Sequence, residues 1–233
     1  MVDAKDWLYD EFKQVGKDYE SNDEVAIYDE SHARFRDVIK ESNDLLDNFS
    51  VNSGESLIDF GCGTGVLAIQ AALRGVNVIA IDISPAMLAY ATSKAKEASV
   101  SSIDFIHSGF LNYEHSAGGV DYIVTSFSFH HLPDYWKGIA LKRMNAMLNS
   151  NGHLYIQDVV ISEENSVENI NSFIESQEKL GGEFLREDAI EHFKDEYSTY
   201  DWVLEGMLNR AGFAVDSKES FIGLISRYIC SKK

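Results

Sequence analysis

The 233-residue sequence is poor in the features that cross-linked, metal-stabilised and membrane proteins require. Cys62 and Cys230 are its only cysteines, too few for a disulfide framework or a structural zinc site. No apolar stretch approaches the roughly 18 residues that a membrane span needs. The N-terminal stretch MVDAKDWLYDEF is acidic and lacks the basic start and apolar centre of a signal peptide. We therefore expect a soluble, reduced, cytoplasmic protein.

Basic residues are also scarce, and this bears on the partners. The chain has 20 Lys and Arg against 38 Asp and Glu, so its formal net charge is −18. Nucleic-acid binding draws much of its affinity from neutralising phosphates, and anionic membranes likewise attract basic segments. The sequence offers no basic patch beyond Arg34-Phe35-Arg36 and Lys142-Arg143. We therefore expect neither a nucleic acid nor a membrane as a partner.

The chain does contain a regular alternation of strand-like and helix-like segments. Residues 1–49 carry amphipathic helical stripes, one of them through Leu8, Phe12, Val15 and Tyr19. After a break at Asn52-Ser53-Gly54, alternation of this kind predicts a parallel sheet with helices on both faces. The predicted strands are 56–60, 76–81, 103–107, 122–126 and 153–160, and the predicted helices between them are 66–74, 85–98 and 134–148.

The remaining third of the chain departs from this rhythm. Residues 162–200 are polar and helix-prone around Gly181-Gly182, and we interpret them as an inserted lid. Residues 203–233 predict one more helix, which ends at Gly212, and two strands separated near Gly223.

The most specific local signal is a glycine cluster that joins the first predicted strand to the first helix, Leu57-Ile58-Asp59-Phe60-Gly61-Cys62-Gly63-Thr64-Gly65. Open parallel sheets bind ligands beyond the carboxyl ends of their strands, and glycine lets a ligand approach the main chain. Asp59 is placed to reach a polar or cationic part of such a ligand. Asp82 ends the second strand, 23 residues further on, where a carboxylate can accept hydrogen bonds from a ribose diol. The alternative is that Asp82 only caps the helix that starts at Ser84-Pro85 and that the glycines only make a turn.

The identity of the nucleotide depends on the spacing of these glycines. A nicotinamide fingerprint would place its third glycine at position 66, where this chain has Val66. The pattern Asp-x-Gly-x-Gly-x-Gly instead resembles that of the class I S-adenosylmethionine-dependent methyltransferases. Three later segments are similar to motifs of that superfamily: Asp82 to Leu88, Val120 to Val124 with Phe129 to Asp134, and Leu148 to Leu154. The resemblance covers roughly residues 55–160 and is specific for fold and cofactor rather than for substrate.

The resemblance implies an α/β fold of the Rossmann-like type. We expect a seven-stranded, mostly parallel sheet with helices on both faces and an antiparallel last strand. An N-terminal helical cap and a helical lid insertion after strand five are expected to close over the carboxyl edge of the sheet. The single domain, residues 1–233, then divides into the cap (1–50), a cofactor-binding core (55–160), the lid (162–200) and a closing helix with two strands (201–233).

The resemblance also implies that S-adenosylmethionine is the cofactor. Its candidate binding residues are Tyr19, Asp59, Gly61, Cys62, Gly63, Gly65, Asp82, Ile83, Met87, Gly109, Phe110 and Ser126. Tyr19 resembles an N-terminal tyrosine that closes over the cofactor in some small-molecule methyltransferases, with helix packing as the alternative. Many relatives carry an acidic residue after the third strand that binds the adenine amino group, and Gly109 stands at that position here. Adenine recognition is then expected to use backbone groups and apolar contact with Phe110 and Met87.

Methyl transfer from a sulfonium is an in-line displacement that depends mainly on positioning and on the exclusion of water. A general base is needed only where the acceptor loses a proton early. His130 and His131, just beyond the fourth strand, are the candidates, with packing and cofactor enclosure as the alternative. Adjacent histidines give no recognisable metal-ligand spacing, so we expect no metal. Asp158 is expected either to orient a substrate or to bond within the protein, and His192 to lie on a solvated helix face.

The sequence thus predicts methyl transfer from S-adenosylmethionine to a small-molecule acceptor. Two alternatives stay open. One is a non-catalytic protein that binds S-adenosylmethionine or holds a partner. The other is a nicotinamide-dependent oxidoreductase, against which Val66 counts.

Overall fold

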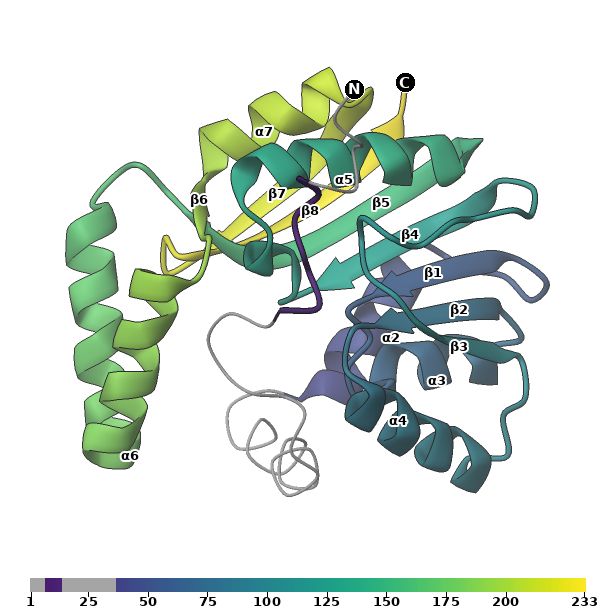
Figure 1. Cartoon of the computed structure of the whole chain (residues 1–233), viewed down its shortest axis with the longest axis horizontal. Helices are drawn as coiled ribbons and strands as arrows, with labels where there is room; N and C mark the ends of the chain where they lie inside the picture. Colours follow the sequence, from purple (N-terminus) through teal and green to yellow (C-terminus); the bar gives the residue numbers. More distant parts are fainter. Residues whose placement is uncertain (1–6, 14–36) are drawn as a thin grey trace.

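A mixed β-sheet forms the centre of the computed structural model, which describes residues 7–13 and 37–233 (Figure 1). Its strand order is β3-β2-β1-β4-β5-β8-β7. Strands β1 to β5 are parallel, and β8 runs antiparallel to both β5 and β7. The seven-stranded, mostly parallel sheet with an antiparallel last strand is therefore confirmed. A two-residue strand, β6, pairs with β5 as an unpredicted eighth member.

The elements follow the predicted alternation closely. The strands are β1 (Ser56–Phe60), β2 (Asn77–Asp82), β3 (Ile103–His107), β4 (Val120–Ser126), β5 (Leu148–Ile161), β6 (Thr199–Tyr200), β7 (Phe213–Phe221) and β8 (Ile225–Lys232). The helices are α2 (Val38–Asn48), α3 (Val66–Leu73), α4 (Pro85–Glu97), α5 (Asp134–Met147), α6 (Ser166–Asp195) and α7 (Asp201–Arg210), and a 3₁₀ turn, η2, covers Phe129–His131.

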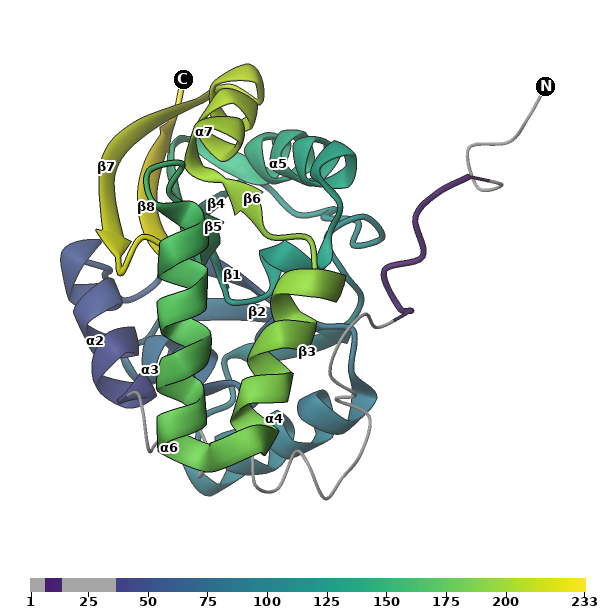
Figure 2. The same cartoon turned by 90° about the vertical axis from the view of Figure 1, so that its left-hand side faces the viewer.

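Successive residues of the central strands feed two hydrophobic cores. In β1, Leu57 is fully buried in the core beneath α2 and α3, whereas Ile58 is fully buried in the core beneath α5 and α7. This alternation follows from the pleat, which points neighbouring side chains to opposite faces. Figures 1 and 2 show these helices in separate layers on the two faces of the sheet. Because β1 is covered on both faces, four consecutive residues, Leu57 to Phe60, are buried.

Local signals fix where α4 begins and α3 ends. The Ser84 side chain accepts a hydrogen bond from the Met87 N–H at 3.2 Å, and Pro85 takes the first helical position, as predicted. Helix α3 ends before Gly75, whose φ of +82° is the left-handed conformation of a glycine stop. The first cap matters most for function because it fixes the chain directly after Asp82.

The predicted N-terminal helical cap is only partly correct. Residues 7–13 form turns instead of a helix. The Asp10 side chain accepts from the Phe12 N–H at 3.2 Å, a local bond that competes with helix formation. Helix α2 does form, but it packs beside α3 on one face of the sheet, where Arg74 pairs with Asp47. Tyr19 lies outside the described residues.

The predicted lid insertion is helical and forms two arms. Helix α6 kinks at Gly181 and Gly182, where φ is −143° and +69°, and its arms extend side by side beyond the sheet (Figures 1 and 2). Neither of the two cavities described below is lined by an α6 residue, so closure over the site stays a prediction. In the described part of the chain, no helix combines the length and apolar character needed to cross a membrane.

Candidate functional site

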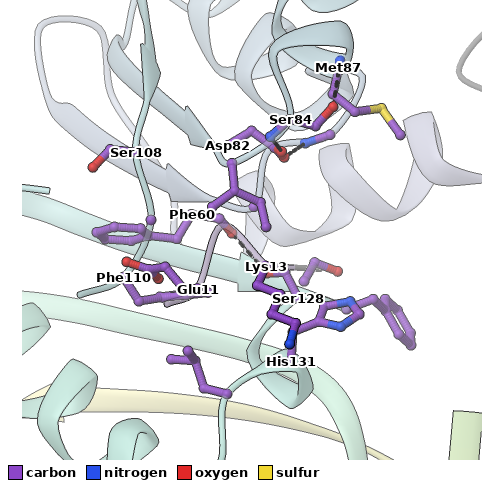
Figure 3. A pocket seen from close by; sticks show the side chains of 17 residues that line it. Glu11, Lys13, Phe60, Asp82, Ser84, Met87, Ser108, Phe110, Ser128 and His131 are labelled. Carbon is purple, nitrogen blue, oxygen red and sulfur yellow. Dashed lines mark hydrogen bonds between the residues drawn. The ribbon is translucent and has the colours of Figure 1, made fainter. Parts of the chain in front are cut away.

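An open cavity lies at the carboxyl ends of β1, β2 and β4 (Figure 3). Its volume is about 910 Å³ with the mouth included, within the range of small-molecule sites. Nine of the candidate residues line it: Gly61, Gly63, Asp82, Ile83, Met87, Gly109, Phe110, Ser126 and His131. Asp59 and Cys62 line an adjoining cavity, whereas Gly65 and His130 line neither of the two.

The glycines of the β1–α3 turn are required for different reasons. All three have positive φ: +69° at Gly61, +50° at Gly63 and +75° at Gly65. A Cβ at Gly61 would overlap Ser128, and one at Gly65 would come within 2.8 Å of the Ala91 Cβ. A Cβ at Gly63 would meet nothing within 4 Å. Gly61 and Gly65 therefore permit packing, while Gly63 leaves open the wall that faces the cavity.

Asp82 braces the turn and keeps unused acceptor capacity. Its Oδ2 accepts from the Gly63 N–H and its Oδ1 from the Ser84 N–H, both at 2.8 Å. A carboxylate has about four acceptor positions, so two are already used and the rest are available to a ligand. Burial raises the pKa of Asp82, and the backbone bonds oppose that rise. Helix capping falls to the Ser84 side chain, so capping alone does not account for Asp82.

Asp59 is less suited to direct ligand contact. It is 3% exposed, and burial followed by repulsion from Asp82 raises its pKa to about 7. The Cys62 thiol beside it has a raised pKa, mainly through burial, which disfavours the thiolate that a nucleophile needs.

Aromatic rings form the apolar wall of the cavity. The Phe60 and Phe110 rings stack with centroids 5.1 Å apart, and Phe129 packs edge-on against Phe110. Phe60 and Phe110, the two rings that line the cavity, are almost fully buried. Phe110 is thus held by its neighbours and presents a fixed surface with Met87 and Leu132.

A buried ionic network holds His130 behind the cavity wall. Asp158 accepts from the Phe129 and His130 backbone N–H groups at 2.7 and 3.2 Å, and from His130 Nδ1. The other ring nitrogen, Nε2, lies 3.0 Å from a Glu196 carboxylate oxygen. Burial lowers the pKa of His130, but the two carboxylates outweigh it and raise the pKa to about 9. His130 is therefore a cation at neutral pH, and Asp158 orients it within the protein.

His192 corrects the sequence interpretation. We expected it on a solvated helix face, yet it is only partly exposed and pairs through Nδ1 with Glu196. Its ring centroid lies 5.0 Å from that of His130. The contact forms because the end of α6 returns to η2, a long-range approach that no local pattern records.

His131 differs from its neighbour in both position and charge. It lines the cavity with Ser128 and Leu132 (Figure 3). Burial, reinforced by the neighbouring His130 cation, lowers its pKa to about 4. At neutral pH His131 is uncharged and retains a basic nitrogen, the form that a general base requires.

One trio in the described ranges has the spacing of metal ligands. His130, His192 and Glu196 offer one ligand atom each, all within 4.8 Å of one another. The Glu196 carboxylate oxygen already contacts a nitrogen of each ring, and these contacts account for the grouping without a metal. The absence of a metal stays a prediction.

The cavity also contains residues that sequence reasoning missed. Glu11 and Lys13 reach it from the N-terminal segment, and Ser108 and Ser128 complete its polar lining. Ser128 was accessible to local reasoning, since it lies between Ser126 and His130. Glu11 carried no local signal, because its position depends on contacts about a hundred residues away.

Comparisons with known proteins agree with this geometry. A methyltransferase-domain family model matches residues 57–152. An uncharacterized methyltransferase of Staphylococcus carnosus is 27% identical over 221 residues, which cover 93% of this chain and 100% of that protein. The structure of magnesium protoporphyrin IX methyltransferase (ChlM) from Synechocystis with bound SAH has a TM-score of 0.63 at 17% identity, covering 84% of this chain and 82% of the other. The cyclopropane synthase MmaA2 of Mycobacterium tuberculosis has a TM-score of 0.67 at 15% identity, covering 83% and 84%.

Proposed function

Because this chain belongs to the class I S-adenosylmethionine-dependent methyltransferase superfamily, we propose that it methylates a small-molecule acceptor. It is an S-adenosylmethionine-dependent methyltransferase, and S-adenosylmethionine is its cofactor. We also propose that the protein is cytoplasmic, which the free thiols of Cys62 and Cys230 support.

The cavity walls fit the chemistry of an adenosyl ligand. Gly63 leaves open space where any other residue would project a side chain. Asp82 keeps free acceptor positions, which suit the two hydroxyl groups of a ribose. Phe60, Phe110 and Met87 provide apolar surface for a flat base. When bound, S-adenosylmethionine supplies an electrophilic methyl group, so the protein has mainly to align and shield the reactants.

The acceptor side of the proposal rests on His131. This residue is neutral at pH 7 and faces the cavity, whereas His130 is charged and enclosed. His131 is thus the member of the pair that can take a proton from an acceptor hydroxyl, amine or thiol. Burial, reinforced by the positive charge of His130 that Asp158 and Glu196 hold in place, lowers the pKa of His131 and keeps its ring uncharged.

The observation that supports a small-molecule acceptor is the limited extent of the cavity. Its wall, part of which is formed by Glu11 and Lys13 of the N-terminal segment, bounds about 910 Å³, and this space has to hold the cofactor as well as the acceptor. The net charge of −18 adds to this, because polyanionic acceptors such as nucleic acids would be repelled. Both observations favour a compact molecule over a polymer.

Calorimetric titration with S-adenosylmethionine, S-adenosylhomocysteine and NADH in parallel tests the proposal, followed by a methylation assay with small O-, N-, S- and C-nucleophiles. We expect micromolar binding of both adenosyl ligands, no binding of NADH, and turnover with at least one small acceptor. Binding of NADH alone would instead support the oxidoreductase. Adenosyl binding without turnover of any small acceptor would overturn the acceptor assignment and favour a non-catalytic binder.

A further inference from the structure

The N-terminal segment, residues 7–13, brings one carboxylate into the fold. Glu11 Oε1 accepts hydrogen bonds from the Leu111 and Asn112 backbone N–H groups at 2.8 and 3.1 Å, and from the Asn112 side chain at 2.7 Å. The residue is only 6% exposed. Enclosing a charged group is unfavourable unless partners compensate for the lost water. The three donors compensate for one of its two oxygens.

Gly109 provides the space that this carboxylate occupies. A Cβ at Gly109 would lie 2.7 Å from Glu11 Oε1 and would overlap its Cδ and Oε2. The Glu11 carboxyl group therefore fills the place into which a side chain at position 109 would project. The fold delivers an acidic group to this point of the cavity from the N-terminal segment and not from the β3 loop.

The second oxygen, Oε2, is the unusual one. It is buried, and among the described residues it has no hydrogen-bond partner. Burial is also the main influence that raises the pKa of the Glu11 carboxyl. A buried acceptor without a donor is unfavourable, and a donor group on a ligand would relieve it. Glu11 lines the cavity beside Ser108 and Phe110, so a ligand can supply that donor (Figure 3).

The register of the sheet identifies which donor of an adenosyl ligand reaches Glu11. Strands β2 and β3 are neighbours, with Asp82 opposite His107, and the Ser108 N–H donates to the Asp82 carbonyl at 3.1 Å. A ribose on the Asp82 carboxylate therefore directs its base either toward the β3 loop or toward the glycine turn. Gly61 and Gly63 of the glycine turn add no apolar side chain to the cavity lining, whereas the β3 loop provides Phe110, which stacks on Phe60. The base consequently lies toward Glu11, and the only N–H donor on adenine is its amino group.

We propose that Glu11 accepts a hydrogen bond from the adenine amino group of the cofactor and selects adenosyl over inosyl ligands. This inference rests on the proposed function. A carboxylate paired with an amino group forms a charge-assisted bond, whereas hypoxanthine presents a carbonyl oxygen at the same place. The carbonyl oxygen and the carboxylate oxygen are both acceptors, so they would face each other with no proton to share.

Binding preference for two ligands tests the inference without any turnover. We would titrate S-adenosylhomocysteine and its deaminated analogue, S-inosylhomocysteine, into the wild-type protein and the variants Glu11→Gln and Glu11→Ala. The wild type should prefer the adenosyl ligand by about 10- to 100-fold, on the scale of a hydrogen bond to a charged group. The preference should fall to within about threefold in Glu11→Ala. It should fall further or reverse in Glu11→Gln, because an amide can donate to the carbonyl.

A reciprocal change separates recognition from packing. Gly109→Asp alone should weaken adenosyl binding, because the new side chain overlaps Glu11. In the double variant Glu11→Ala/Gly109→Asp the same substitution should restore the adenosyl preference, since a carboxylate then arrives from the β3 loop. Glu114→Gln is the matched control, because Glu114 is an exposed acid of the same loop whose side chain is 86% accessible. It should keep the wild-type preference.

The possible outcomes are distinct. Suppose that the wild type binds S-adenosylhomocysteine and that the Glu11 variants prefer it to the inosyl analogue as strongly as the wild type does. Glu11 then does not recognise the base, and this inference is wrong while the proposed function stands. If the wild type binds neither S-adenosylmethionine nor S-adenosylhomocysteine, the proposed function itself fails. Circular dichroism of each variant identifies loss of fold, and the double variant then provides the deciding measurement.

Discussion

The charge on His130 leads to a defined dependence of stability on pH. Its pKa is raised from 6.5 to about 9 in the folded protein, chiefly by Asp158 and Glu196 acting against burial. Below pH 6.5 the ring is protonated in both folded and unfolded chains, so the full stabilisation is present. As pH rises from 6.5 through 9, only the folded state keeps the proton, and the stabilisation is lost. At about 1.4 kcal/mol per unit of pKa, the loss is on the order of 3 kcal/mol.

The measurement is urea unfolding, followed by circular dichroism, at pH 6 and pH 10 for the wild type and His130→Asn. Asparagine can still donate to Asp158 but does not titrate. The free energy of unfolding of the wild type should therefore fall by about 3 kcal/mol more than that of the variant. Groups away from His130 that titrate in this range, including the thiols of Cys62 and Cys230, are common to both proteins and cancel in the difference.

Lys142→Gln, which removes an exposed cation from α5, is the control and should show the same change as the wild type between pH 6 and pH 10. Equal pH dependence in the wild type and His130→Asn would refute the reasoning, because it would mean that His130 is not charged in the folded protein. At acid pH the stability changes in the opposite direction, rising with pH. Asp158 and Glu196 have lowered pKa values, so the stability they provide is present above their ordinary values and is lost as pH falls below about 4.

Three further predictions concern the cavity. Asp82→Ala should weaken S-adenosylhomocysteine binding in calorimetry by about tenfold or more, the scale of a lost charge-assisted hydrogen bond, and unchanged affinity would reduce Asp82 to a brace for the turn. Gly63→Ala should weaken the same binding about tenfold because Gly63 lines the cavity and the added methyl group would take up space that is now open. Gly54→Ala, with φ +89° and equally open space, should show similar strain of about 1–2 kcal/mol and normal affinity. His131→Ala should leave that affinity within about threefold and lower kcat by roughly 10²-fold or more once an acceptor is known, while full activity in both His131→Ala and His130→Ala would end the general-base hypothesis.

The parts of the fold that sequence predicts are those with local signals. The strand that carries Leu57 and Ile58, the glycine turn after it and the Ser84-Pro85 helix start each depend on residues within a few positions of one another. Their periodicity and conformational preferences are visible in the sequence. The antiparallel last strand followed from a family resemblance, since pairing between distant strands leaves no local pattern.

The parts that could not be predicted depend on distant contacts. In the sequence, Glu11 is one acidic residue among several. Its role becomes visible only in the fold, where the loop after β3 places Leu111 and Asn112 beside it. His130 and Glu196 come together only when the end of α6 returns to the sheet. Residues 7–13 illustrate the same limit, because their apolar spacing favours a helix that the burial of Glu11 and the turn at Asp10 override.

The distance along the chain between Glu11 and Leu111 also has a consequence for biosynthesis. The two are 100 positions apart, and ribosomes add roughly 5–20 residues per second, so Glu11 waits about 5–20 s before its partner is made. Trp7 and Phe12 emerge in the same early segment and remain partly exposed even after docking, at 53% and 39%. The cavity is therefore completed late in translation, by the oldest part of the chain folding back onto a newer one. A bulky domain fused ahead of residue 7 would therefore act on this late docking step and not on the residues of the core.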